Sequence, residues 1–175
     1  MLKKLIIIGA GAHAKVILEA ALQQGAYEVL GFCVDAKPIG ERVFGEYAVV
    51  SDAQLNALSG DLNVHFVVAI GDNEARKRLF EIAKNKFTPA TIIHPRAYVS
   101  PKSCVASGSV VLAGAVINTS ASVGINSIVN LGVLVDHDSV IGDHVHLSPG
   151  TVVGSYASVP DFYLTALGQV IPVSP

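Results

Sequence analysis

Every sixth residue in the C-terminal half of the chain is aliphatic, and this period constrains the fold more than any other feature of the sequence. The register does not slip over twelve successive positions, which are Ile93, Val99, Val105, Val111, Ile117, Val123, Val129, Val135, Ile141, Leu147, Val153 and Val159. The residue four places after each of them is small or β-branched from position 97 to position 157. A six-residue period excludes an α-helix and is typical of short flat strands joined by tight turns, with the aliphatic side chain pointing inward.

The repeat therefore predicts an all-β domain, a left-handed parallel β-helix, over residues 91–175. In proteins with this repeat, three hexapeptides make one triangular coil, so residues 93–164 correspond to four coils. After Val159 the pattern weakens, because residues 161–163 interrupt the small corner position and Thr165 takes an aliphatic position. We therefore expect an irregular last coil and a β-helix that is short for this repeat.

The first half of the chain has a different construction, in which apolar runs alternate with helical patterns. Strands are predicted at residues 5–8, 29–34 and 64–70, and helices at residues 15–24 and 74–86. This order indicates a parallel βαβαβ sheet, that is, a Rossmann-like α/β unit. Prolines at 89 and 95 interrupt any helix there, so we place the domain boundary between residues 1–90 and residues 91–175.

Charge and composition exclude several classes of protein. The net charge of −2 indicates no general attraction to nucleic acid. No apolar run approaches the roughly 18 residues that span a bilayer, and the first apolar run is too short for a signal peptide, so we expect no membrane span and a cytoplasmic location. Cys33 and Cys104 are two cysteines far apart in the chain, which excludes a disulfide framework and a spaced metal site.

A glycine-rich turn, Gly9-x-Gly11-x-x-Ala14, lies between the first predicted strand and helix. Glycines there let the backbone approach an anion and the helix N-terminus offers free N–H groups, so the turn predicts phosphate binding; a plain structural turn is the alternative. His13 in this loop can donate to a phosphate or sugar oxygen. Asp35, at the end of the second predicted strand, either accepts from a ribose or base or simply caps the strand.

Three histidines, His137, His144 and His146, lie in one stretch with acidic neighbours. No Cys or Glu joins them, so we expect no metal. General base catalysis is the better interpretation, because a carboxylate bonded to one ring nitrogen leaves the other to accept a proton near neutral pH. His137 has such a carboxylate on either side, Asp136 and Asp138. The alternative for His137 and His144 is a solvent-facing polar corner.

The chain resembles the bacterial nucleotide-sugar acetyltransferases of the sialic acid O-acetyltransferase and UDP-N-acetylbacillosamine N-acetyltransferase type, within the hexapeptide-repeat acyltransferases. The resemblance covers about residues 4–155 and rests on four blocks in the same order, LIIIGAGAHAKVILEAA, AIGDNEARKRL, IIHPRAYVSP and AGAVINTSASVGINSIVNLGVLVDHDSVIGDHVHLSPG. It implies a homotrimer of left-handed β-helices. It also implies an N-terminal unit that binds the nucleotide-sugar, and acetyl-CoA in the cleft between neighbouring subunits.

The resemblance also implies roles for individual residues. His137 corresponds to the catalytic base, Asp138 to the acid that orients it, and His146 to a second histidine lining the acetyl-CoA slot. The positions that match nucleotide-sugar contacts are Gly9, Gly11, His13, Asp35, Asp72, Asn73 and the sugar-facing Asn118. The backbone N–H of Ser155, one coil beyond His137, is the expected oxyanion donor, where the family more often has glycine.

The expected reaction is transfer of an acetyl group from acetyl-CoA to the amine of a nucleotide-linked amino sugar. Acetylation of a sugar hydroxyl, as on sialic acid, is the close alternative, since the same base can promote it. A third interpretation is a catalytically impaired nucleotide-sugar-binding protein. It follows from the early end of the helix and from the absence of Lys and Arg after Lys102 to meet the coenzyme phosphates.

Overall fold

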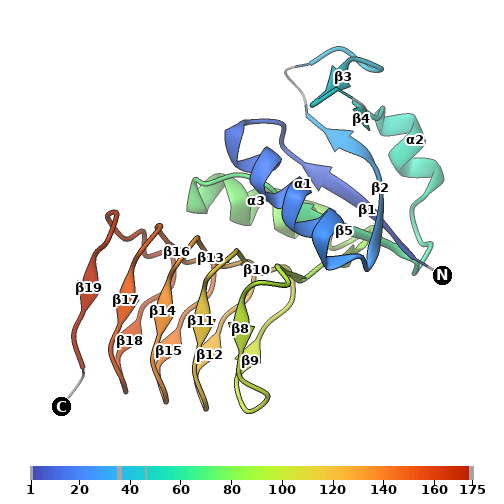
Figure 1. Ribbon diagram of the computed structural model, residues 1–175. Coiled ribbons are helices and arrows are strands. Elements are labelled where there is room, and N and C mark those ends of the chain that lie inside the picture. The colour runs from blue at the N-terminus through green and yellow to red at the C-terminus, as the bar shows by residue number, and fades with distance from the viewer. Residues whose placement is uncertain (1, 35–36, 46, 174–175) are drawn as a thin grey trace. The chain divides into compact units, whose positions relative to one another are not determined.

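The computed structural model describes residues 2–34, 37–45 and 47–173, and the chain divides into two compact units, residues 1–90 and 91–175 (Figure 1). The first unit combines helices with a parallel sheet, and the second is built from stacked two-residue strands. The expected fold class, a Rossmann-like unit followed by a left-handed parallel β-helix, is confirmed.

The first unit is built on a four-stranded parallel sheet in the order β2-β1-β5-β6. Its strands are β1 (Lys3–Ile8), β2 (Tyr27–Cys33), β5 (Val64–Val68) and β6 (Thr88–Pro89). β1 lies in the middle and pairs with β2 and β5, which explains why it is a continuous apolar run. The short β6 was not predicted, because two residues that include a proline produce no pattern.

Helices connect these strands, and they begin and end at the capping residues that the sequence contains. α1 (Ala12–Gln24) begins after Gly11 and stops at Gly25, whose φ of +69° is a left-handed conformation that favours glycine. α3 (Asn73–Ala83) begins after Asp72. Between β2 and β5 the chain forms the small hairpin β3 (Arg42–Val43) and β4 (Tyr47–Ala48), then α2 (Asp52–Ala57).

The second unit is a β-helix of three parallel sheets (Figure 1). One sheet contains β7 (Ile92–Ile93), β10 (Val110–Val111), β13 (Ile128–Val129) and β16 (His146–Leu147). The second contains β8 (Tyr98–Val99), β11 (Val116–Ile117), β14 (Leu134–Val135), β17 (Val152–Val153) and β19 (Val170–Ile171). The third contains β9 (Cys104–Val105), β12 (Ser122–Val123), β15 (Val140–Ile141) and β18 (Ser158–Val159).

Paired strands are offset by 18 residues, as in Val116 with Tyr98 and Leu134 with Val116, so one coil is three hexapeptides. The aliphatic position of each hexapeptide fills the interior, where Val111, Ile117, Val129, Leu147 and Val153 are fully buried. The small corner residues, among them Ala115, Ala121 and Ala157, are buried in the same cluster.

The corners have a recurring backbone conformation. From residue 108 to residue 168, every sixth residue has a left-handed φ. Five of these positions are glycine, and the other six, with φ between +53° and +62°, are Ser120, Asn126, Asp138, His144, Tyr156 and Phe162.

The weaker repeat after Val159 does not interrupt the β-helix. β19 pairs with β17 in the same 18-residue register, so the helix continues to Ile171. Thr165 occupies the inward position and is buried, with its hydroxyl 2.7 Å from the Ser148 amide nitrogen and 2.8 Å from Thr151 Oγ1. These partners satisfy the polar group, so a threonine can replace the aliphatic residue without breaking the coil.

Candidate active site

His137 lies at the corner between β14 and β15, on residues 136–139. The corner turns because Asp138 adopts a left-handed φ of +60°, and its amide donates to the Thr119 carbonyl of the previous coil at 3.1 Å. The Ser139 hydroxyl donates to the Asp136 carbonyl at 2.6 Å, which closes the turn from inside. The catalytic candidate therefore stands on a rigid corner.

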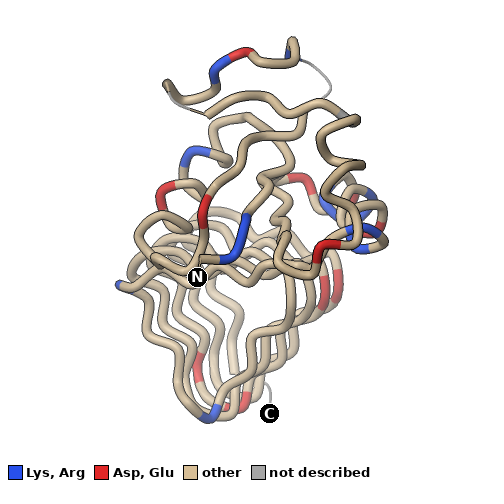
Figure 2. The backbone as a smooth tube through the Cα atoms, turned by 90° about the vertical axis from the view of Figure 1, so that its right-hand side faces the viewer, with Lys and Arg blue, Asp and Glu red and all other residues tan. Residues whose placement is uncertain are grey.

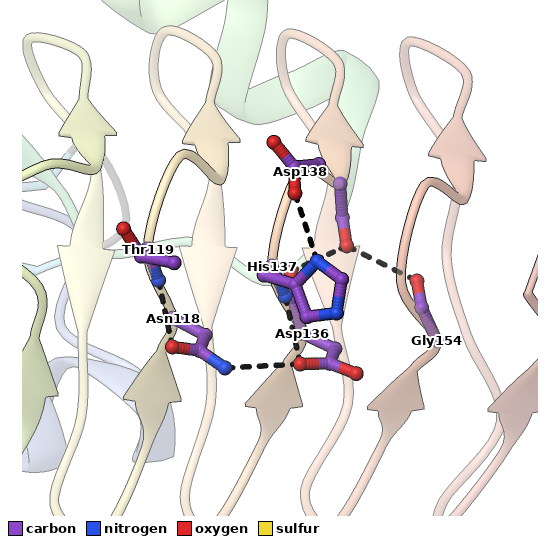
Figure 3. A network of polar contacts seen from close by, with 7 residues as sticks. Asn118, Thr119, Asp136, His137, Asp138 and Gly154 are labelled. Atoms are coloured by element: carbon purple, nitrogen blue, oxygen red, sulfur yellow. Dashed lines mark hydrogen bonds and ion pairs between the residues drawn. The ribbon is translucent and has the colours of Figure 1, made fainter.

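The imidazole of His137 is held by Asp138. Its Nδ1 lies 2.8 Å from Asp138 Oδ2, and the two side chains are 38% and 41% exposed (Figure 3). An ionised carboxylate only accepts, so Nδ1 carries the proton and Nε2 keeps its lone pair. This arrangement is suited to general base catalysis at Nε2.

Asp136 has a different role from Asp138. Its Oδ1 accepts from the backbone N–H of His137 at 2.8 Å and from Asn118 Nδ2 at 3.0 Å (Figure 3). These two hydrogen bonds lower the pKa of Asp136. Of the two carboxylates that the sequence left open, Asp138 bonds the ring and Asp136 bonds the backbone.

Asn118, expected to face the sugar, lies one coil before Asp136. Its amide donates to Asp136, and its Oδ1 accepts from the Thr119 amide at 2.7 Å. A groove of about 280 Å³ runs along the outer side of this sheet beside the two residues, with walls that are otherwise apolar. It is lined by Val116, Asn118, Leu134, Val135, Asp136, Val152, Val153 and Gly154.

Ser155 lies one coil beyond His137, as expected from the 18-residue offset. In the two preceding coils, the side chains of Asn118 and Asp136 accept the N–H of the next residue. Gly154 has no side chain, so the Ser155 N–H lacks this local acceptor. The amide is therefore suited to an incoming oxyanion.

Tyr156 is a neighbour of His137 that the sequence did not point to. The two rings meet edge to face at 5.3 Å and 90°, and the Tyr156 amide donates to the His137 carbonyl at 3.2 Å. The available signal was its position at a corner, because the equivalent turn position is glycine at five other corners.

His144 and His146 lie elsewhere on the β-helix. His146 opens β16, nine residues and therefore half a coil after His137, and its Nε2 lies 3.1 Å from Asn130 Nδ2. The proposed solvent-facing corner is wrong for His144, which is 7% exposed. Its Nδ1 lies 3.0 Å from Asn126 Nδ2, and its ring stacks on Phe162 at 5.2 Å.

The glycine-rich turn of the first unit leaves the N-terminus of α1 open. Gly9 has a φ of +105°, and a Cβ there would lie 3.1 Å from the Ala69 carbonyl oxygen, so only glycine fits without strain. A Cβ at Gly11 would meet nothing within 4 Å, and no side chain caps the helix. His13 lies in the first turn of α1.

Asp35 falls outside the described residues. A cavity of about 340 Å³ lies at the carboxyl end of β2, and Cys33, Lys37 and Ser51 are among the residues that line it.

Asp72 and Asn73 shape the loop after β5. Asp72 caps α3 by accepting from the Ala75 amide at 2.8 Å, and Asn73 Oδ1 accepts from the buried Arg76 at 2.7 Å. Arg76 also donates to the carbonyls of Ile70 and Gly71, and burial lowers its pKa to about 10. Arg76, which the sequence did not single out, thus organises the loop at the end of the strand.

The described residues were compared with the patterns of a metal site and of a membrane-spanning helix. Among the described residues, no three His, Cys, Asp or Glu side chains are grouped as metal ligands. Over the same part of the chain, no helix has the length and apolarity to cross a membrane.

Several known proteins are similar to this chain in sequence and in fold. A family model described as the PglD N-terminal domain matches residues 4–83. The chain is 32% identical to the acetyltransferase domain of PglB from Neisseria gonorrhoeae FA1090, solved in complex with acetyl coenzyme A. That match covers 98% of this chain and 94% of that chain, with a TM-score of 0.82.

Two further structures are similar. PerB from Caulobacter crescentus, in complex with CoA and GDP-perosamine, is 29% identical with a TM-score of 0.81, over 99% of this chain and 93% of that chain. Structures of two variants of this perosamine N-acetyltransferase, in which one histidine is replaced by asparagine or alanine, are similar to this chain as well. WeeI from Acinetobacter baumannii AYE, at 17% identity and a TM-score of 0.71 over 97% of this chain and 89% of that chain, shows the fold alone. No curated protein matches the sequence.

Proposed function

Because the chain belongs to the nucleotide-sugar acetyltransferase family that includes the PglB acetyltransferase domain, we propose that it transfers acetyl from acetyl-CoA to the amine of a nucleotide-linked amino sugar. The single observation that supports this chemistry most directly is the His137–Asp138 pair on a rigid corner, with Nε2 left to take a proton. The PerB complex with CoA and GDP-perosamine supports the same pair of substrates.

The chemical step uses His137, Asp138 and the backbone N–H of Ser155 in the next coil. The sugar amine attacks the thioester carbonyl while Nε2 of His137 takes its proton, and Asp138 stabilises the imidazolium that forms. The Ser155 N–H donates to the oxyanion of the tetrahedral intermediate. When the C–S bond breaks, the imidazolium returns the proton to the thiolate, which releases coenzyme A.

The first unit supplies the groups for the nucleotide. We place the phosphates of the nucleotide-sugar at the open N-terminus of α1, against Gly9, Gly11 and His13. The base then belongs in the cavity at the end of β2, and Asp35 stays a predicted contact of the ribose or base. Asp72 and Asn73 contribute by shaping the neighbouring loop. We place Asn118 and the groove beside it on the sugar side of the reaction, in the second unit.

A homotrimer accounts for two features of the second unit. His137 and His146 lie half a coil apart, on opposite sides of the triangular prism, so His146 can line the acetyl-CoA slot only for the His137 of a neighbouring subunit. Outside the groove, the outer side of the β14 sheet is apolar and exposed, with Tyr98 at 56% and Val170 at 66%. Contact between subunits would cover such a surface.

The coils contain few charges to hold the coenzyme (Figure 2). Arg96 and Lys102 are the two cations in residues 91–175 of the sequence. We therefore expect acetyl-CoA to bind mainly through apolar and backbone contacts along the coils. Because acetyl-CoA and nucleotide-sugars are substrates of cytoplasmic metabolism, we propose a cytoplasmic location.

A coenzyme A release assay tests the function. UDP-, GDP- and TDP-linked amino sugars are supplied with acetyl-CoA, and we expect release with at least one of them and an N-acetyl product by mass spectrometry. The matched control is the same nucleotide-sugar with a hydroxyl in place of the amine, and sialic acid tests O-acetylation. Release only with the hydroxyl compounds would contradict amine transfer, and no release with any of them would contradict the acetyltransferase assignment.

A further inference from the structure

Tyr156 is an aromatic residue in a backbone conformation that disfavours it. Its φ is +58°, in the left-handed region where a side chain crowds the backbone and a bulky residue is an outlier. The equivalent turn position is glycine at residues 108, 114, 132, 150 and 168, in the other two columns of corners, whereas the column of Tyr156 has the small Ser120 and Asp138. Glycine would therefore suit this turn better than tyrosine does.

Burial does not compensate for this conformation, because Tyr156 is 59% exposed. Its ring meets that of His137, one coil earlier, at 5.3 Å and 90°. Edge-to-face rings at this separation attract each other specifically. The tyrosine thus occupies an unfavourable conformation and gains a contact with the catalytic candidate.

The His137 ring is consequently held on two sides. Asp138 bonds Nδ1 at 2.8 Å, and Tyr156 meets the ring from the next coil. A single hydrogen bond fixes the tautomer but permits rotation about the side-chain bonds, whereas a second contact restricts the ring to one rotamer. Among the described residues no group hydrogen-bonds to Nε2, so the rotamer alone decides where its lone pair lies.

We propose that Tyr156 is a positioning residue that holds the His137 imidazole in its reactive rotamer, an inference that rests on the proposed acetyl transfer. The ring of Tyr156 provides this function, and its hydroxyl is dispensable. The residue acts on the rate of the chemical step and has no role in the stability of the β-helix.

Three variants test the proposal by steady-state kinetics and thermal unfolding. Tyr156→Asn keeps a residue that tolerates the left-handed turn, Tyr156→Gly relaxes the turn, and Tyr156→Phe keeps the ring. We expect kcat to fall about five- to tenfold in both the Asn and the Gly variants, with KM within about twofold, because the ring contact is lost. Tyr156→Phe should keep the wild-type kcat, and no variant should lower Tm.

Ser120→Gly is the matched control, since Ser120 has the same conformation in the same corner column, two coils before Tyr156, with φ of +60°. It should leave kcat unchanged. A wild-type kcat in Tyr156→Asn would overturn the inference, and so would a fall in kcat confined to the Gly variant, which would indicate a loosened turn. A wild-type protein that transfers no acetyl group would instead overturn the proposed function itself.

Discussion

At the scale of single residues, the carboxylates on either side of His137 make different hydrogen bonds. Asp138 bonds the His137 ring, while Asp136 bonds the backbone of the same residue and the side chain of Asn118. Asn118 makes the same contact to the amide of Thr119 one coil earlier, so the corner itself does not require a carboxylate. Charge matters for the ring, where Asp138 stabilises the imidazolium.

His137→Ala should lower kcat by about 10² to 10⁴, because general base catalysis contributes about that factor. Asp138→Asn should lower kcat less, since it disturbs only the tautomer and orientation of the ring. The coenzyme A release assay measures kcat for both variants, and the KM for acetyl-CoA serves as the internal control. Near-wild-type kcat in His137→Ala, together with inactivity of His146→Ala, would reassign the base to His146.

At the scale of the coil, close stacking leaves no space at one column of corners. A Cβ at Gly142 would collide with the carboxylate of Asp161 and lie 2.7 Å from the Asp161 amide nitrogen, in the next coil. Gly124 faces Asp143 in the same way. The Asp161 carboxylate also accepts from the Asp143 amide at 2.8 Å, so it cannot move away without losing a bond.

Gly142→Ala should therefore destabilise the β-helix by about 1–3 kcal/mol, the usual cost of overpacking. Urea unfolding measures this as a lower midpoint. Gly132→Asn is the control, because a Cβ there would meet nothing within 4 Å and its φ of +65° resembles that of Asn126. Equal midpoints for Gly142→Ala and the wild type would show that the coils can separate at this corner.

At the scale of the whole molecule, our proposal of a slot shared by His137 and His146 needs more than one subunit, because the two residues lie half a coil apart. The first unit has its own core around Phe66 and Phe80, and the second has its own interior, so each can fold around separate apolar clusters. The active site in our proposal is completed by association.

Light scattering should give a mass three times 18.2 kDa. Mixing subunits provides a sharper test, because a site built from His137 of one subunit and His146 of the next is restored when His137→Ala and His146→Ala chains associate. Random mixing in a cyclic trimer should recover about a quarter of the wild-type sites. Each variant refolded alone is the control, and a mixture no more active than its components would contradict the shared site.

The sequence by itself determined the fold, because both patterns depend on local rules. An inward aliphatic every sixth residue has one regular solution, and alternating apolar and helical runs predict the parallel sheet of the first unit. The resemblance of the sequence to the family indicates His137 as the base. Glycines 9 and 11 likewise marked the turn before α1.

Only the tertiary structure decided which residues meet across coils, since such contacts join positions 18 residues apart that no local pattern connects. It assigned Asp138 to the ring and Asp136 to the backbone, buried His144 between Asn126 and Phe162, and brought Tyr156 to His137. It also placed Thr165 in an interior position, where its hydroxyl bonds the Ser148 amide and the Thr151 hydroxyl of the previous coil. For His144, Tyr156 and Thr165 the contact is one between stacked coils, set by the coil's geometry. Asp136 and Asp138 are sequence neighbours of His137, and the direction of each side chain at the turn decides which of them bonds the ring.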